Sequence, residues 1–148
     1  MTDDFAAAVG ASARFSRTLA ESDIYLFAGL TGDLCPNHMD EQFMAKTVYG
    51  RRIAHRALLV EFMSRASTVI TDGCGRLSKA FYAVSLGYDR IRFLRPDFVG
   101  DTTTIGFTKS TAAADTMRTP AEIQLKNQNE EVCAIATHIM ERLPISKS

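Results

Sequence analysis

The chain has 148 residues, of which 46% are hydrophobic and 23% are charged, an ordinary composition for a globular domain. The 17 basic and 17 acidic residues give a formal net charge of zero, which argues against nucleic acid or an anionic membrane as the main partner. The three cysteines lack a Cys-x-x-Cys spacing, so the pattern argues against a disulfide framework or a zinc knuckle and favours a reducing compartment. We therefore expect a single domain over residues 1–148.

The start of the chain, from Met1 to Phe5, lacks the basic residues and the apolar core of a signal peptide. No apolar run approaches the roughly 18 residues that are needed to cross a bilayer. We therefore expect a cytoplasmic protein without a membrane partner. Residues 1–11 are small and acidic, and we expect them to form a flexible arm.

A strand and two helices are predicted in the first third of the chain. Residues 13–19 alternate between two faces, as expected of a strand. Ser22 is a suitable N-cap for a helix over residues 23–30. A short helix is expected over residues 39–46, with Asp40 as its cap.

The longest helix is predicted over residues 56–70. One face of it carries large apolar side chains at helical spacing: Leu59, Phe62, Met63, Ala66 and Ile70. A second face carries mostly small side chains: Ala57, Val60, Ser64, Ser67 and Thr68. A helix that is apolar or small over most of its surface is expected to be buried.

Four extended segments follow, and they mix β-branched and aromatic residues with turn signals between them. They span residues 81–94, 102–110, 117–126 and 132–143. Residues 127–130 are typical of a hairpin turn. One long helix followed by a run of strands predicts the α+β class.

The loop over residues 31–38 carries the clearest chemical signal. Asp33 and His38 lie five positions apart, and Gly32 and Pro36 break the helical pattern around them. A short loop of this kind can turn both side chains toward one point, where they could share a proton or a water. Such a pair can take a proton at one stage and return it at another, as general acid–base catalysis requires.

A resemblance to a known family rests on three groups of residues: Gly32-Asp33-x-x-Pro36-x-His38, Ala45, and Gly50-Arg-x-Ile-Ala-His55. Together they resemble the hydratase-2 signature of MaoC-like (R)-specific enoyl-CoA hydratases. Residues 23–30 and 91–102 also fit that family, and the match runs from about residue 15 to about residue 143. The resemblance implies a hot-dog fold, in which a curved antiparallel β-sheet wraps around a long central α-helix.

The resemblance also implies a reaction. Asp33 and His38 would hold one water beside Cβ of a trans-2-enoyl thioester and return a proton to Cα. The product would be the (R)-3-hydroxyacyl thioester, and dehydration would be the reverse. The backbone N–H of Arg56, at the start of the long helix, would stabilise the thioester oxygen. The family pattern assigns substrate binding to Ala54, His55, Arg56 and Ser64.

By the same resemblance, no metal or redox cofactor is required, and coenzyme A or acyl carrier protein carries the acyl group. Four arginines are candidates to bind the carrier's phosphates: Arg51, Arg52, Arg92 and Arg95. Because the edges of a small sheet are usually covered by a second copy, a homodimer or a dimer of dimers is expected.

The chain departs from the family pattern at three positions. Cys35 stands where the family usually has Asn, Asn37 where it has an aliphatic residue, and Arg56 where it has Gly. The Arg56 side chain could fill the substrate tunnel, bind a carboxylate on the acyl group, or pair with Glu61.

Alternative interpretations remain open at this stage. The chain could be a non-catalytic subunit that binds acyl thioesters, or a hot-dog thioesterase that uses Glu61. Cys35 could act as a nucleophile with His38. No further ligand spaced for a metal beside the loop pair is evident. Capping or packing is favoured for His55, and a structural role is favoured for His138.

Overall fold

A computed structural model gives the structure of the protein and describes residues 10–73, 81–110 and 117–145. Five strands form one antiparallel sheet in the order β1-β3-β4-β5-β2. The strands are β1 (Ser12–Thr18), β2 (Phe81–Phe93), β3 (Thr102–Lys109), β4 (Arg118–Lys126) and β5 (Val132–Pro144). The helices are α2 (Glu21–Thr31), α3 (Pro36–Met39), α4 (Glu41–Met44) and α5 (Arg56–Gly73).

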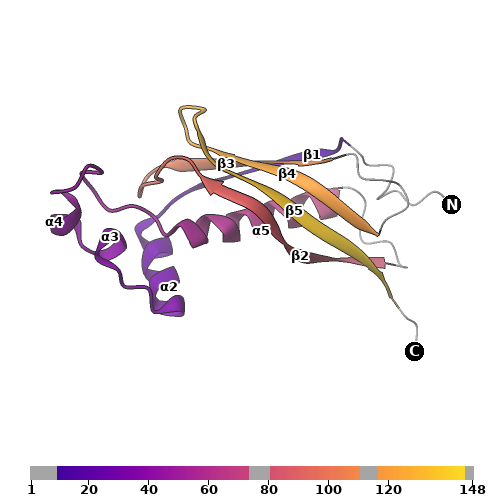
Figure 1. Ribbon diagram of the computed structural model, residues 1–148, viewed down its shortest axis with the longest axis horizontal. Coiled ribbons are helices and arrows are strands. Elements are labelled where there is room, and N and C mark those ends of the chain that lie inside the picture. The colour runs from indigo at the N-terminus through magenta and orange to yellow at the C-terminus, as the bar shows by residue number, and fades with distance from the viewer. Residues whose placement is uncertain (1–9, 74–80, 111–116, 146–148) are drawn as a thin grey trace.

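The long helix α5 runs along one face of the sheet, and the three shorter helices gather at one end of it (Figure 1). This confirms the α+β hot-dog arrangement, and the strands and the long helix begin and end within a few residues of their predicted bounds. Alternation along β3 turns Ile105 and Phe107 inward, where both side chains are fully buried. They pack in one core with the buried face of α5, which includes Leu59 and Met63.

The expectation that α5 is buried all round is wrong for the single chain. Its large apolar side chains are buried, as the helical spacing predicts: Leu58, Leu59, Phe62, Met63 and Ala66. The flank of small side chains is open instead, with Ala57, Ser64 and Thr68 exposed. One five-stranded sheet covers one side of a helix, so the second flank stays uncovered within this chain.

Two N-terminal expectations are corrected. Gly10 and Ala11 are not part of a flexible arm, because both form backbone hydrogen bonds with Lys109 at 3.2 and 3.0 Å. The rest of that arm lies outside the described residues. Helix α2 begins at Glu21, so Ser22 is not its cap. Asp23 serves this end, because its carboxylate accepts the N–H of Ala20 at 2.9 Å.

The short helix expected over residues 39–46 is confirmed only in part, as α4 over Glu41–Met44, and a separate short helix, α3, covers Pro36–Met39 within the expected loop. Asp40 lies between them with an extended backbone (φ −113°, ψ 101°), which interrupts the helix. Its role as a cap is confirmed, because Oδ1 accepts the N–H of Phe43 at 2.9 Å. The hairpin turn after β4 is also confirmed by the bond from Asn127 N–H to the Glu131 carbonyl, at 3.0 Å.

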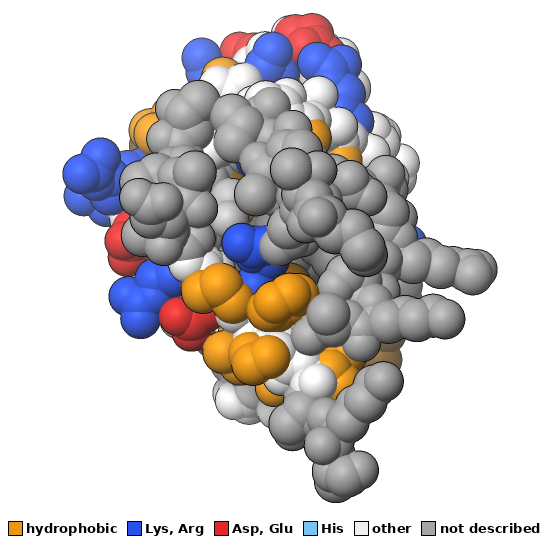
Figure 2. Space-filling model, turned by 90° about the vertical axis from the view of Figure 1, so that its right-hand side faces the viewer, with side chains coloured by type: hydrophobic (Ala, Val, Ile, Leu, Met, Phe, Trp, Pro, Cys, Tyr) orange, Lys and Arg blue, Asp and Glu red, His pale blue; other side chains and the backbone are white. Residues whose placement is uncertain are grey.

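Figure 2 views the molecule from the end opposite α2, α3 and α4. Basic and acidic side chains lie interleaved along its upper and left edges, and hydrophobic side chains gather below its centre. Among the described residues, no helix is long and apolar enough to span a bilayer.

Candidate active site

The loop that carries the acid begins where α2 ends. Gly32 adopts a left-handed conformation (φ 76°), and its N–H donates to the Ala28 carbonyl at 2.8 Å. Glycine pays no steric penalty at this angle, so the chain turns sharply away from the helix. The next residue, Asp33, accepts the N–H of Cys35 at 3.3 Å, and Pro36 then starts α3.

The imidazole of His38 is fixed from behind by the backbone. Its Nδ1 lies 2.8 Å from the carbonyl oxygen of Ile53, and the residue is only 8% exposed. Because a carbonyl oxygen only accepts, Nδ1 must carry the hydrogen, and Nε2 of the neutral ring keeps its lone pair. The free Nε2 is therefore the atom of His38 that can accept a proton.

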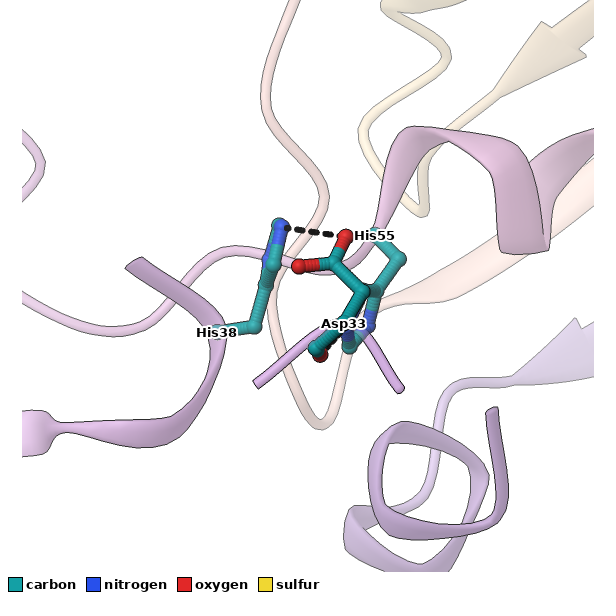
Figure 3. Close-up of side chains that lie close together, drawn as sticks. All are labelled: Asp33, His38 and His55. Atoms are coloured by element: carbon teal, nitrogen blue, oxygen red, sulfur yellow. Dashed lines mark hydrogen bonds and ion pairs between the residues drawn. The ribbon is translucent and has the colours of Figure 1, made fainter. Parts of the chain in front are cut away.

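The Asp33 carboxylate faces this nitrogen (Figure 3), and its Oδ2 lies 3.9 Å from His38 Nε2. That distance is too long for a direct hydrogen bond, but one water at about 2.8 Å from each atom fits between them. The Asp33 side chain is half exposed, so a substrate can reach it. The pair can therefore hold a water and take a proton from it.

His55 joins this pair from the end of the segment that precedes α5. Its Nε2 donates to the main-chain carbonyl of Asp33 at 3.0 Å. Its ring stacks on His38 with the centroids 3.8 Å apart, and Phe27 lies 5.0 Å away. His55 is 1% exposed, which agrees with the packing role favoured for it.

The sequence interpretation missed that His55 adds a third candidate metal ligand. One ligand atom from each of Asp33, His38 and His55 lies within 4.8 Å of the others. However, the two histidine rings are 3.8 Å apart and only 24° from parallel. A metal must lie in the plane of each ring at about 2 Å from its nitrogen, and planes so nearly parallel meet much farther away. This arrangement does not fit one ion bound by both rings.

Arg56 is the first residue of α5, where backbone N–H groups are free of intrahelical partners. Its φ is not positive, so the backbone at this position does not require glycine. The exposed side chain does not turn to Glu61. It donates to the Phe93 carbonyl at 3.3 Å, and its guanidinium lies 5.4 Å from the Phe93 ring.

Of the other predicted substrate-binding residues, Ala54 is buried and Ser64 is exposed. The Ala54 N–H donates to the Asp97 carbonyl at 2.8 Å, so that N–H is not available to a ligand. Ser64 is exposed on α5, about 12 Å along the helix from Arg56. It lies within hydrogen-bonding reach of Tyr88 on β2. The structure thus gathers Asp33, His38 and His55, with Ser64 farther along the helix.

Two of the four candidate phosphate-binding arginines are engaged with carboxylates. Arg52 lies 2.6 Å from Glu21 and 3.0 Å from Glu41, and its side chain is 14% exposed. Arg95 lies 3.4 Å from Glu131. The guanidinium of Arg51 instead lies 3.9 Å from the Phe98 ring, and Arg92 donates to the Ile91 carbonyl at 2.8 Å.

Comparisons with known proteins identify a matching family and several relatives. The family described as "MaoC like domain" matches residues 4–132. An (R)-specific enoyl-CoA hydratase from Rhodospirillum rubrum is 39% identical over 95 residues, which are 64% of this chain and 60% of that protein. Protein MaoC of Klebsiella aerogenes is 36% identical over 92 residues, which are 62% of this chain. The match covers less than two thirds of either relative, and only 25% of Protein MaoC.

Solved structures show the same fold. An (R)-hydratase from A. caviae, described as involved in PHA biosynthesis, superimposes with a TM-score of 0.77 at 25% identity. The superposition covers 90% of this chain and 95% of that one. The R-hydratase PhaJ1 from Pseudomonas aeruginosa superimposes with a TM-score of 0.76 at 26% identity, over 95% of this chain and 87% of that one.

Proposed function

Because this chain belongs to the MaoC-like domain family, we propose that it hydrates trans-2-enoyl-CoA to (R)-3-hydroxyacyl-CoA and catalyses the reverse dehydration. The observation that carries the proposal is the 3.9 Å gap between Asp33 Oδ2 and His38 Nε2. The gap admits one water, and the hydrogen bond from His38 Nδ1 to Ile53 leaves Nε2 free to accept a proton from it.

In the proposed mechanism, the water oxygen bonds to Cβ while one of its protons passes to the Asp33–His38 pair. A proton from the same pair goes to Cα, so hydrogen and hydroxyl add to the same face of the double bond. Charge builds on the thioester oxygen as the enolate forms. The N–H of Arg56 at the start of α5 would donate to that oxygen, aided by the helix dipole.

Coenzyme A is the proposed carrier, and a second copy of the chain is the proposed partner, in a homodimer or a dimer of dimers. Two surfaces support a second copy. Strand β2 is an edge of the sheet, and the flank of α5 around Ala57 and Ser64 is exposed. A cytoplasmic location, a role in fatty acid metabolism and the lack of a cofactor remain proposals.

The test is hydration of a short trans-2-enoyl-CoA, followed by the loss of its conjugated absorbance. Asp33→Asn and His38→Gln should each lower kcat by at least about 10²-fold, because each replaces a group that can take and return a proton with an amide that cannot. Cys35→Ala is the matched control, since Cys35 lies in the same loop but faces solvent. Wild-type turnover that survives in Asp33→Asn would refute the mechanism.

The same experiment separates the competing functions. Loss of activity in Cys35→Ala would identify a thiol nucleophile instead. An inactive wild-type protein that still binds acyl-CoA would be the non-catalytic subunit. Release of free thiol from an acyl-CoA, abolished by Glu61→Gln, would identify a thioesterase. Burial raises the pKa of the Tyr88 hydroxyl, and the charge of Glu61 on α5 adds to that rise.

A further inference from the structure

One short segment, Ile53 to His55, holds both proposed catalytic groups. The Ile53 carbonyl accepts from His38 Nδ1 at 2.8 Å. Two residues later, His55 Nε2 donates to the Asp33 carbonyl at 3.0 Å. The base is thus anchored through its side chain and the acid through its backbone.

This segment is itself attached to its surroundings on both sides. The Ile53 N–H donates to the Asn37 carbonyl at 3.0 Å, and the Ala54 N–H donates to the Asp97 carbonyl at 2.8 Å. Ile53 also forms an isolated bridge with Phe98. A hydrogen bond from His55 therefore links the acid's loop to a fixed part of the fold.

His55 makes the tether to Asp33 that the short loop itself does not provide. Most of the other hydrogen bonds of this loop are local: the Asp33 N–H donates to Thr31 Oγ1 at 3.2 Å, and Leu34 N–H to the Gly32 carbonyl at 3.0 Å. A local path also joins the acid to the base, because the Asp33 carboxylate accepts the Cys35 N–H at 3.3 Å and the Cys35 carbonyl accepts the His38 N–H at 2.9 Å. These local bonds set the shape of the loop but do not constrain Asp33 against the segment before α5. The bond from His55 spans 22 positions in sequence and supplies that constraint.

We propose that His55 is a positioning residue, which holds the Asp33 carboxylate at its working distance from His38 through the Nε2–H···O=C bond to the Asp33 backbone. The inference rests on the proposed hydratase function. Rates of this kind depend steeply on geometry, and a displacement of about 1 Å can cost about 10²-fold in rate. The buried ring, stacked on His38 and in tilted contact with Phe27, keeps the N–H pointed at the carbonyl.

The hydrogen bonds also assign opposite tautomers to the two stacked rings. His38 donates from Nδ1 to the Ile53 carbonyl, whereas His55 donates from Nε2 to the Asp33 carbonyl. The ¹⁵N spectrum of the imidazoles distinguishes these tautomers directly, whether or not the protein turns over a substrate.

The test uses two substitutions that separate the ring from its donor. His55→Phe keeps an aromatic ring against His38 but loses the N–H, whereas His55→Gln keeps an N–H donor at a similar reach. His55→Phe should lower kcat by about 10- to 10²-fold with KM within about twofold, and His55→Gln should recover most of that loss. His138→Phe, the same exchange at a buried histidine of β5, should leave kcat close to that of the wild type.

Wild-type kcat in His55→Phe would overturn the inference. Equal losses of kcat in His55→Phe and His55→Gln, in proportion to their losses in melting temperature, would also overturn it. That result would indicate that His55 acts through packing alone. A wild-type protein inactive on every enoyl thioester would instead refute the proposed function. In that case the ¹⁵N spectrum still decides on the tether: an Nε2–H proton on His55 supports it, and an Nδ1–H tautomer overturns it.

Discussion

Tyr88 of β2 lies directly over His138 of β5, with the ring centroids 4.3 Å apart and the ring planes 10° from parallel. The two residues are register partners on neighbouring strands. His138 is fully buried, and its Nε2 lies 2.7 Å from Ser85 Oγ. This agrees with the structural role favoured for His138, and it gives the protein a buried group that titrates.

The first prediction concerns acid stability. Burial lowers the pKa of His138 from its ordinary 6.5 to about 4, so folding favours the neutral ring. The contribution of His138 to the free energy of unfolding is fully present above about pH 6.5. It is lost as the pH falls from there toward about 4, because the unfolded chain binds the proton first. Chemical unfolding at several pH values should show a loss of a few kcal/mol from this group.

The control for that loss is His138→Phe, which keeps an aromatic ring against Tyr88 but cannot bind a proton. The difference in unfolding free energy between the wild type and this variant should change between pH 7 and pH 4. A difference that stays constant over this range would show that His138 does not control acid stability.

The second prediction concerns Asp97, which is 2% exposed and accepts from Thr103 Oγ1 at 3.2 Å. Burial raises the pKa of its carboxyl above the ordinary value. The protonated form is therefore favoured by folding, and stability is lost as the pH rises through the folded-state pKa. Asp97→Asn should gain stability relative to the wild type as the pH is raised from 4 to 7, as measured by urea unfolding. A pH-independent difference would contradict this.

The third prediction concerns Arg52, whose guanidinium contacts Glu21 at the start of α2 and Glu41 in α4. A lysine keeps the charge but cannot present two donors to both carboxylates in a fixed plane. Arg52→Lys should lower the unfolding free energy by about 1 kcal/mol. Arg92→Lys is the control, because Arg92 donates only to a neighbouring carbonyl among its described contacts. Equal melting temperatures for the two variants would contradict the stabilising role of the Arg52 contacts with Glu21 and Glu41.

The fourth prediction concerns the arginine that replaces the family's glycine. The Arg56 side chain is exposed at the start of α5, beside Phe93 and next in sequence to His55. We predict that it favours enoyl thioesters whose acyl group carries a carboxylate. Arg56→Gly should lower kcat/KM for an acidic enoyl-CoA by about tenfold relative to a neutral one, because one exposed charge-assisted hydrogen bond is lost. An unchanged ratio of kcat/KM between the acidic and the neutral substrate would contradict this prediction.

Much of the fold was predictable because its signals are local. Each of the four C-terminal strands was expected within two residues of its bounds, since alternation and turn residues act over a few positions. The N-terminus of α2 was misplaced because its N-cap is Ala20, whose N–H donates to the Asp23 carboxylate inside the helix, and not Ser22. Competing caps two residues apart are not separable by pattern alone.

The sequence by itself predicted that Asp33 and His38 lie close together, because the loop bounded by Gly32 and Pro36 is short. Only the tertiary structure decided that His55 lies against both of them, and that Arg52 is paired with Glu21 rather than free to bind phosphate. These contacts join residues 22 and 31 positions apart. Local propensity carries no information about such distances, which are set when α2 and the segment before α5 pack at the same end of the sheet.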